Sequence, residues 1–517
     1  MSTDATTSAT SLAADATALP DDPIILKRMI AELLATLHER DHELEGVRHR
    51  LDQLLRRLFG PRAERLDPAQ ILLFGDAGQP PKGPAASLDE TPATANNGTA
   101  GQGHGRRRPP SDLPRVRVEH DLPEAERACP DCGAARARIG ADTSEQLDYQ
   151  PASVFVVEHV RHTYACAHCQ GSVTTAPKPA GPIAKGLPGP GLLAHVTVSK
   201  YVDHLPLYRQ ERIFERQGVT LPRTTLCDWM AATAALLTPL YEHMKSDVLR
   251  SRVLHTDDTP VPVQDPESDK TKTGRLWVYL GDREHPSNVF DYTPTRQRDG
   301  PRQFLQAYHG YLQADAFGGY DGIYATGRVV EVCCNAHARR KFYEARDSDA
   351  ARAHQALAYY RQLYALEADL KDANDAERLR VRQAEAAPLL AVYRHWLDAE
   401  RPDVLPKSPM GQAFTYVLNQ WEALTRYTTA GFLAIDNNVA EREMKRIATG
   451  RKNWLFCGSD QGGRTAAVLF SFASTCQRHA VNPFAYLRDI LRRLPTHPAD
   501  QLAELLPPRW TPPNLPA

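Results

Sequence analysis

The chain has 517 residues, of which 42% are hydrophobic and 24% charged, and its formal net charge is −1. This length suffices for two to four domains, and the composition is ordinary for a soluble globular protein, which excludes a collagen-like or wholly disordered chain. Basic residues nevertheless cluster, with six Arg against three acids in 44–66 and six Lys or Arg against three acids in 437–464. Such clusters suit either a DNA surface or an ordinary solvated face.

The sequence is expected to contain neither a membrane span nor a secretory signal. No apolar run approaches the roughly 18 residues of a membrane span, and residues 1–23, expected to be a disordered lead, lack the apolar core of a secretory signal. Four of the nine Cys residues form two CxxC pairs. In a chain expected in the cytoplasm, these pairs favour metal binding over disulfides.

Residues 24–60 are predicted to form one long helix. Apolar residues recur every seven positions, with a second apolar row between them, at Ile30, Leu37, Leu44, Leu51 and Leu58 and at Leu33, Val47 and Leu54. Such heptads predict a coiled coil and hence self-association, although an amphipathic helix packed on its own protein is an alternative. Residues 75–115, rich in Gly, Pro, Ala, Thr and Asn, are predicted to be a flexible linker.

A zinc-binding module is predicted over residues 116–175. Two CxxC pairs, 33 residues apart, can supply four thiolates to one tetrahedral structural site: Cys129, Cys132, Cys166 and Cys169. The intervening residues alternate in the manner of a β-hairpin. Four sulfur ligands leave no open coordination position, so no catalysis is expected there.

The remaining sequence predicts helices followed by a mixed α/β sheet. Residues 190–245 are predicted to be helical, with a turn at Gly218 and a helix start at Pro222 that suit either a helix-turn-helix or a helical pair that merely packs. From residue 252, four strand-like segments and a fifth before Cys334 predict a mixed sheet rather than a barrel. A long helical block follows over about 345–425.

Two predicted strands end in acids. One ends at Asp257-Asp258 and another at Asp315. Carboxylates at adjacent strand ends converge on one edge of a sheet, where divalent cations accept oxygen ligands and a pair of them can assist phosphoryl transfer. The alternative is that each acid merely caps a loop.

A third acid is expected on the helix that follows Asp436. Glu441 and Glu443 both border its apolar stripe of Ala440, Met444 and Ile447, so periodicity does not choose between them. Glu441 shares a face with Lys445 and Lys452, which suits either a metal ligand beside a DNA phosphate or ordinary ion pairing along the helix.

The sequence resembles the transposases of the IS66 family of bacterial insertion sequences. The resemblance lies in the Leu heptads, the CxxC pairs and a series of blocks in family order: FGPRAERL (59–66), HTDDTPVPV (255–263), LQADAFGGY (312–320), CNAHARRKF (334–342), DNNVAEREMKR (436–446) and GRKNWLFCGSDQGG (450–463). One departure is visible, because the family usually has Asp-Glu-Thr-Pro where this chain has Asp257-Asp258-Thr259-Pro260. Because of that departure, either Asp257 or Asp258 could correspond to the first Asp of the family motif.

The resemblance implies a multidomain α+β protein with an RNase H-like core. The core would comprise residues 250–345 and 426–480, with a helical insertion at 346–425 and a C-terminal element at 481–517. Its DDE triad would be Asp257, Asp315 and Glu441, holding two Mg²⁺ or Mn²⁺ ions. The residues expected to contact DNA are Arg339, Arg340, Lys341, Lys445, Arg451 and Lys452.

The implied activity is metal-dependent cleavage at the ends of the insertion sequence, followed by transfer of the freed 3′-hydroxyl into target DNA. The expected partners are double-stranded DNA, at least one further copy of the chain and possible element-encoded accessory proteins, in the bacterial cytoplasm at the nucleoid. Two alternatives remain: a catalytically inactive, zinc-containing DNA-binding regulator, and a structure-specific RNase H-like nuclease.

Overall fold

The computed structural model describes residues 153–165, 173–177, 180–184, 186–265, 267 and 269–512, with Lys27, Leu34, Thr36, Arg40 and Leu44 as single residues. Those five are helical, and the rest of the predicted coiled coil, the lead, the linker and all four zinc-ligand Cys residues lie outside the described residues. No helix among the described residues is long and apolar enough for a membrane span.

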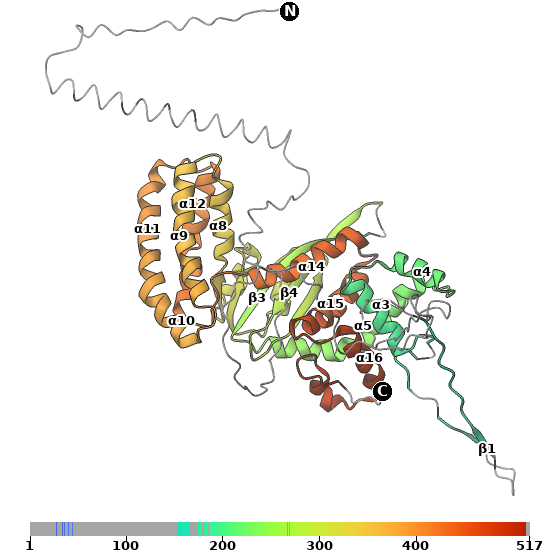
Figure 1. Ribbon diagram of the computed structural model, residues 1–517. Coiled ribbons are helices and arrows are strands. Elements are labelled where there is room, and N and C mark those ends of the chain that lie inside the picture. Colours follow the sequence, from blue (N-terminus) through green and yellow to red (C-terminus); the bar gives the residue numbers. More distant parts are fainter. Residues whose placement is uncertain are drawn as a thin grey trace, which may run out of the picture. The chain divides into compact units, whose positions relative to one another are not determined.

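A five-stranded mixed sheet organises the region after residue 250, as the sequence predicts (Figure 1). Its order is β5-β4-β3-β6-β7; β3, β4 and β5 form an antiparallel meander, and β6 and β7 continue the sheet in parallel from β3. The strands are β3 (Val253–Gln264), β4 (Thr271–Leu280), β5 (Asn288–Thr293), β6 (Gly310–Ala314) and β7 (Val329–Cys333).

Strand β3 runs six residues beyond Asp258, so the prediction that it ends at Asp257-Asp258 was wrong. Its ladder with β4 continues to Gln264, whereas its ladder with β6 stops at His255. Beyond that point, within the described residues, one side of β3 has no neighbouring strand until Val263 bridges to Cys457. Proline lacks an N–H and tolerates such an open side, which explains how Pro260 and Pro262 fit within a strand.

The two faces of the sheet are covered by different elements. On one face, Tyr279 of β4 stacks on Phe304 of α6 (Asp299–Phe304), with ring centroids 3.7 Å apart. On the other, Phe290 of β5 contacts Phe470 of α15 (Asp460–Arg478). Because both faces are buried, the end of β4 is apolar at every position rather than at alternate ones.

Helices precede the sheet, as predicted for 190–245: α3 (Pro190–Tyr201), α4 (Leu207–Arg216) and α5 (Arg223–Val248). Gly218 adopts a φ of 79° in the turn after α4, a conformation that glycine takes without steric cost, and Pro222 caps α5. All three helices bury side chains in the same core as the sheet, including Phe214 and Trp229. Their predicted helix-turn-helix role stays a prediction.

A separate core lies within the helices that follow β7. These are α8 (Asn335–Glu344), α9 (Ala350–Asp369), α10 (Asp375–Val381), the π-helical η5 (Arg382–Ala386), α11 (Ala387–Glu400), η6 (Arg401–Asp403), α12 (Pro409–Asn419), α13 (Trp421–Thr425) and η7 (Arg426–Thr429). Arg382, 1% exposed, binds both Glu367 carboxylate oxygens at 2.8 and 2.7 Å. It also donates to the carbonyls of Tyr427 and Leu433, which fixes the chain as it returns to the sheet.

The entry and exit of this helical block are joined at Asn335. Its buried side-chain amide donates to the carbonyls of Leu424 and Ile435 at 2.9 and 3.1 Å, and its backbone N–H also donates to Ile435. Residues 100 positions apart in the chain therefore meet next to the end of β7.

The chain ends with α14 (Asn438–Trp454), α15 and α16 (Pro483–Arg493), then η8 (Leu494–Thr496) and η9 (Ala499–Leu505). The predicted buried stripe of α14, formed by Ala440, Met444 and Ile447, is confirmed. Two short helices, η4 (Gly318–Tyr320) and α7 (Asp321–Tyr324), connect β6 to β7.

The zinc-module prediction is tested only at its hairpin. The structure pairs β1 (Thr163–Ala165) with β2 (Val173–Thr175), and residues 153–162 form no strand. The hairpin therefore flanks the second CxxC pair in sequence. For residues 153–162, the described part of the interval between the two pairs, the predicted hairpin is wrong.

Candidate active site

Asp257 lies on β3, and Asp315 follows directly after the end of the neighbouring parallel strand β6. The last residues paired between β3 and β6 are His255 and Gln313, and each acid lies two residues further along the chain. Side chains two residues apart on a strand share a face. Asp257 therefore continues the row that His255 begins, and Asp315 leaves the sheet just beyond Gln313.

The segment before α14 is anchored to this row. The Asn437 side-chain amide donates to the Thr256 carbonyl at 2.7 Å, and the Asn437 Oδ1 lies 3.0 Å from His255 Nδ1. The Gln313 amide donates to the carbonyls of Ala434 and Asp436. Burial lowers the pKa of His255 to about 4, so this imidazole is neutral near pH 7 and donates to the Asn437 oxygen. These contacts hold the N-terminus of α14 against β3 and β6.

Glu441 is in the first turn of α14 and faces the site, whereas Glu443 does not. Glu443 pairs with Arg446 at 3.0 Å and accepts a hydrogen bond from Ser474 of α15 at 2.6 Å. Glu441 instead lies beside Cys334 and His337, at the junction of β7 and α8. The structure thus separates two residues that helical periodicity left equivalent.

Negative charge accumulates around Asp257. The pKa of its carboxyl is raised to about 8, mainly by burial and further by the charges of Asp315 and Glu441. The backbone N–H of Asp258, 2.8 Å from Asp257 Oδ1, opposes this shift only in part. Asp257, Asp315 and Glu441, far apart in the sequence, are therefore close enough for their charges to interact.

Asp315 is in a more balanced environment. Burial raises the pKa of its carboxyl, while the neighbouring His337 and Arg296 lower it. The Arg296 guanidinium is 3.9 Å from Asp315 Oδ2 and 2.9 Å from Asp258 Oδ1. Arg296 therefore lies between Asp315, just after β6, and Asp258 of β3.

The Asp258 carboxylate is paired with two arginines. Its carboxylate, 3% exposed, accepts from Arg275 at 2.8 Å and from Arg296 at 2.9 and 3.2 Å. Consecutive residues of a strand point to opposite faces, and Asp258 is paired across the ladder with Trp277. Asp257 lies on the other face, which α14 covers: Arg451 of α14 donates to Thr259, two residues beyond Asp257, at 3.1 Å.

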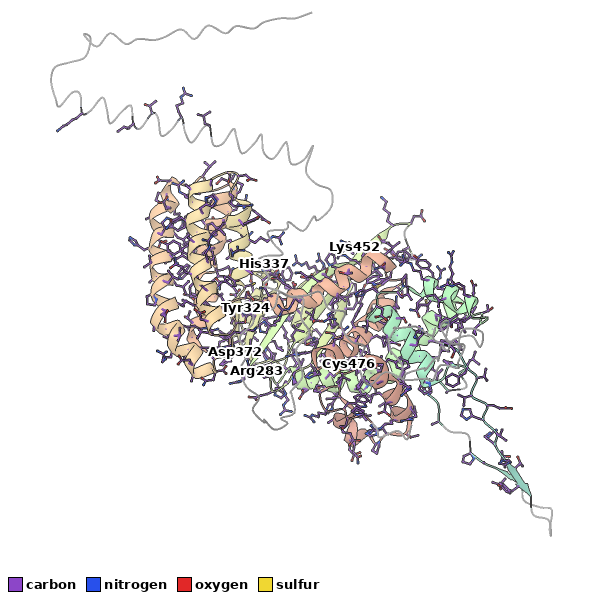
Figure 2. All side chains as sticks on the ribbon, in the orientation of Figure 1. Arg283, Tyr324, His337, Asp372, Lys452 and Cys476 are labelled. Carbon is purple, nitrogen blue, oxygen red and sulfur yellow. The ribbon has the colours of Figure 1, made fainter. Side chains whose placement is uncertain are left out.

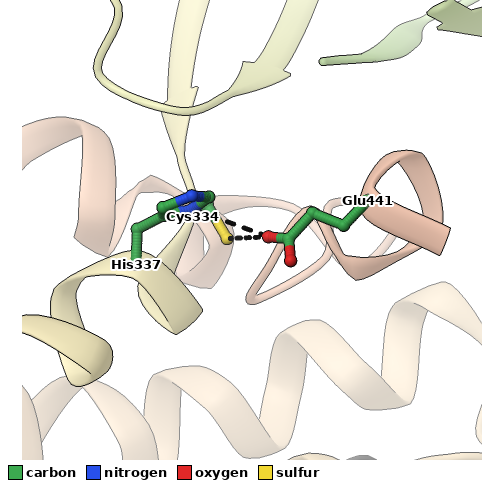
Figure 3. Close-up of side chains that lie close together, drawn as sticks. All are labelled: Cys334, His337 and Glu441. Atoms are coloured by element: carbon green, nitrogen blue, oxygen red, sulfur yellow. Dashed lines mark hydrogen bonds and ion pairs between the residues drawn. The ribbon is translucent and has the colours of Figure 1, made fainter. Parts of the chain in front are cut away.

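A thiol and an imidazole lie next to Glu441 (Figure 3). Cys334 Sγ is 3.8 Å and His337 Nδ1 3.6 Å from Glu441 Oε1. Neither a role for Cys334 nor its proximity to Glu441 was expected from the sequence. The signal that could have found it is the spacing Cys-x-x-His, which at the start of a helix places both side chains on one turn.

The residues predicted to contact DNA fall into two groups. On α8, Arg339 is half-buried, Arg340 pairs with Glu344 at 2.9 Å, and Lys341 lies 4.8 Å from the centroid of the Tyr416 ring. On α14, Arg451 donates to the Thr259 hydroxyl and the Pro260 carbonyl, whereas Lys445 and Lys452 are exposed. Figure 2 labels Lys452. Arg451 thus fastens α14 to β3, and the DNA contacts stay predictions.

Comparison with known families identifies the protein. Residues 185–465 match the family described as "Transposase IS66 family", which covers more than half of the chain. The chain belongs to the IS66 family of transposases. IS66 membership extends to its other parts, since residues 126–170 match the "zinc-finger binding domain of transposase IS66" and residues 471–507 the "IS66 C-terminal element". Residues 47–118 match an element described as "Transposase C of IS166 homeodomain", which is leucine-zipper-like.

Three curated relatives of this IS66 transposase come from Sinorhizobium fredii (strain NBRC 101917 / NGR234). "Uncharacterized protein y4hP" is 32% identical over 496 residues, covering 89% of this chain and 88% of the relative. "Uncharacterized protein y4jD" is 32% identical over 511 residues, covering 95% and 97%. "Uncharacterized protein y4qI" is 32% identical over 398 residues, or 74% of each chain. The similarity to the first two spans nearly the whole IS66 architecture.

Membership of a DDE transposase family carries general implications. It implies transposition, DNA as a partner and a divalent metal for the chemistry. The zinc-finger match implies zinc. The roles of individual residues do not follow from family membership alone.

Proposed function

We propose that this chain cleaves DNA at the ends of its insertion sequence and joins the freed 3′-hydroxyl to target DNA, with Asp257, Asp315 and Glu441 as its DDE triad. The core would be RNase H-like. The strand order β5-β4-β3-β6-β7, with an antiparallel meander followed by two parallel strands, supports that assignment.

The observation that carries the proposal is the charge environment of Asp257. Its carboxyl pKa rises to about 8 because burial is combined with the charges of Asp315 and Glu441. A buried carboxyl whose charged form is further disfavoured by two neighbouring acids fits a divalent cation site, since a bound cation offsets both the repulsion and the desolvation penalty. Asp258 does not fit, because two arginines already neutralise it.

Asp257, Asp315 and Glu441 would hold the Mg²⁺ or Mn²⁺ ions. A pair of such ions activates the attacking oxygen and stabilises the leaving oxygen of a phosphodiester. The chain's own contribution is to position its ligands: Asn437 and His255 fix the start of α14, and Arg451 fixes the helix further along β3. Arg296 lies beside Asp315 and could orient a phosphate as well as its acid partners.

Other parts of the proposed enzyme would bind rather than react. Cys129, Cys132, Cys166 and Cys169 fall within the matched zinc-finger domain and have the donor set of a closed structural zinc site. Exposed Lys445 and Lys452, with Arg339, Arg340 and Lys341 on α8, are proposed to contact DNA phosphates.

The test compares Glu441→Gln with Glu443→Gln on supercoiled plasmid carrying the element ends, in Mg²⁺. We expect Glu441→Gln to lose cleavage while binding the ends normally, and Glu443→Gln to retain cleavage. The two residues are one half-turn apart on one helix, so Glu443→Gln controls for general damage to α14. Normal cleavage by Glu441→Gln would overturn the triad. A wild-type protein that bound the ends without cleaving would instead be a regulator, and cleavage without strand-transfer products would identify a nuclease.

A further inference from the structure

We propose that Cys334, His337 and Glu441 form a site for one transition-metal cation of the Zn²⁺ type, and that an ion held there takes Glu441 away from the Mg²⁺ ions. The binding site stands on its own geometry. Its effect on cleavage rests on the proposed function, because that effect requires Glu441 to belong to the triad.

The three ligand atoms already have a suitable spacing. Cys334 Sγ, His337 Nδ1 and a Glu441 carboxylate oxygen all lie within 4.8 Å of one another, the one group of three or more such side chains found in the part of the chain that the structure describes. Glu441 Oε1 is 3.8 Å from the sulfur and 3.6 Å from the nitrogen. Tetrahedral zinc with bonds of about 2.0–2.3 Å places neighbouring ligand atoms roughly 3.3–3.5 Å apart. Shifts of a few tenths of an ångström would close these two distances.

His337 Nδ1 supports the site independently. This nitrogen is buried and has no hydrogen-bond partner among the described residues. It faces Glu441 at a distance just beyond a hydrogen bond (Figure 3). A buried polar atom without a partner is unfavourable. A metal ion between the imidazole and the carboxylate would satisfy it.

Cys334 is placed to act as a thiolate ligand. It occupies the N-cap position of α8 without a side-chain capping hydrogen bond, and the Asn437 N–H donates to its sulfur at 3.1 Å. Burial and the charge of Glu441 raise the pKa of this thiol well above its ordinary value, so the thiolate would form only together with a bound cation. A thiolate and a carboxylate together also balance the charge of a divalent cation when the imidazole is neutral.

The donor set selects the class of metal. Sulfur and imidazole ligands favour Zn²⁺ and related ions, whereas Mg²⁺ takes oxygen ligands. Cys334 is fully buried, while His337 and Glu441 retain side-chain exposures of 34% and 25%, so the ion would enter from their side. Glu441 then belongs to two overlapping sites of different chemistry. Because Zn²⁺ would compete with the Mg²⁺ ions for the Glu441 carboxylate, we expect it to inhibit Mg²⁺-dependent cleavage.

The experiment measures metal binding by the full-length protein. Wild type, Cys334→Ser, His337→Ala and the control Cys333→Ser are equilibrated with micromolar Zn²⁺ and analysed for bound zinc. Cys333 is the adjacent cysteine, but its sulfur lies 3.6 Å from the Tyr416 hydroxyl rather than beside Glu441. We expect Cys334→Ser and His337→Ala to bind one zinc fewer per chain, and Cys333→Ser to match wild type.

Cobalt provides the spectroscopic test. With the zinc-finger cysteines zinc-loaded, Co²⁺ should give a thiolate charge-transfer band in wild type and Cys333→Ser but not in Cys334→Ser. In His337→Ala the Co²⁺ affinity should fall by about tenfold or more. Equal zinc content and equal cobalt spectra in all four proteins would overturn the site. Unchanged thermal unfolding of His337→Ala would show that lost binding is not lost folding.

The consequence for cleavage is measured as a ratio of activity with and without micromolar Zn²⁺ at fixed Mg²⁺. The ratio should be low in wild type and in Cys333→Ser, and near one in Cys334→Ser. Equal inhibition of all three would overturn the competition while leaving the binding result intact. Asp257→Asn separates the two proposals, because it should lose cleavage yet keep the cobalt band.

Discussion

Asp257 and Asp258 are consecutive residues of β3 whose carboxylates have opposite electrostatic environments. Asp257 has a pKa raised to about 8 and faces further acids, whereas Asp258 is held by Arg275 and Arg296. The alternation of side chains along a strand is the cause, because it sends the two residues to different faces of the sheet. Opposite consequences follow from removing each charge.

Asp257→Asn should stabilise the metal-free protein at neutral pH. The folded-state pKa of Asp257, about 8, lies above its ordinary value near 4, so its stabilising contribution is complete below pH 4 and is lost as pH rises through 8. We expect the variant to gain about 2 kcal/mol in free energy of unfolding at pH 8, less than the full shift implies since the side chain keeps some solvent exposure.

Urea unfolding at pH 5 and pH 8 measures this effect. The gain should be small at pH 5, and Mg²⁺ should stabilise wild type more than Asp257→Asn at pH 8. A variant less stable than wild type at pH 8 without Mg²⁺ would contradict the raised pKa.

Asp258→Asn should destabilise the protein. The change leaves Arg275 and Arg296 without their shared carboxylate in a nearly buried position. We expect a loss of about 2–3 kcal/mol, below the roughly 3–5 kcal/mol for a fully buried ion pair, because the Arg275 and Arg296 side chains remain 20% and 41% exposed. The same urea titration, at pH 7, compares it with Asp257→Asn. If both variants shifted stability in the same direction, the assignment of the two faces would be wrong.

Arg382→Met should strongly destabilise the helical block. Arg382 is buried and binds Glu367 together with backbone carbonyls of the returning chain, so its loss leaves a carboxylate and several carbonyls unpaired. A loss of about 3–5 kcal/mol is expected. Arg380→Met is the matched control, because Arg380 also makes two short bonds to one glutamate, Glu377, but on the surface.

The control variant should leave stability nearly unchanged, because solvent screens the exposed pair of Arg380 and Glu377. Thermal unfolding followed by circular dichroism suffices for both, since most of the block is helical. Equal shifts for Arg382→Met and Arg380→Met would show that burial does not distinguish the two ion pairs.

Asn437→Ala should weaken metal use more than DNA binding. Asn437 is a positioning residue that ties the start of α14 to Thr256 and His255, and Glu441 is one turn away. We expect the Mg²⁺ concentration for half-maximal cleavage to rise by about tenfold, the scale on which loss of a supporting contact weakens a metal site. End binding should be unchanged.

The control for this variant is Asn453→Ala, in the last turn of the same helix. Asn453 is partly exposed, and its Oδ1 accepts a hydrogen bond from Arg209 at 3.4 Å, far along the helix from the acids. Identical Mg²⁺ dependence for Asn437→Ala and wild type would remove Asn437 from the positioning role.

The sequence predicted the sheet, the helices at 190–245 and the helical block, because these depend on periodicity over many residues. It did not distinguish Glu441 from Glu443, since both border the buried stripe of α14, and only the packing of Ser474 and Arg446 against Glu443 separates them. It placed the end of β3 too early because an acid pair in a strand suggests its end. The carboxylates are tolerated there by Arg275 and Arg296 on one face and the open site on the other.

The Cys334, His337 and Glu441 cluster escaped sequence analysis for a different reason. Its members lie on two helices separated by about a hundred residues, and no periodic signal relates them. The roles of Arg339, Arg340, Lys341, Lys445, Arg451 and Lys452 in DNA contact remain predictions. Arg451 also holds α14 against β3 through hydrogen bonds to Thr259 and Pro260, a role that the sequence did not indicate.

Because Asn335 joins the two ends of the helical block, the position of the acids does not depend on how long that block is. Because Asn335 binds Leu424 and Ile435 directly, the chain leaves the sheet and rejoins it at nearly one point. Residues between those points can then be added, removed or exchanged during evolution without changing where Glu441 arrives. The sequence of the helical block can therefore change, for example to bind new partners, without altering the arrangement of the proposed catalytic acids.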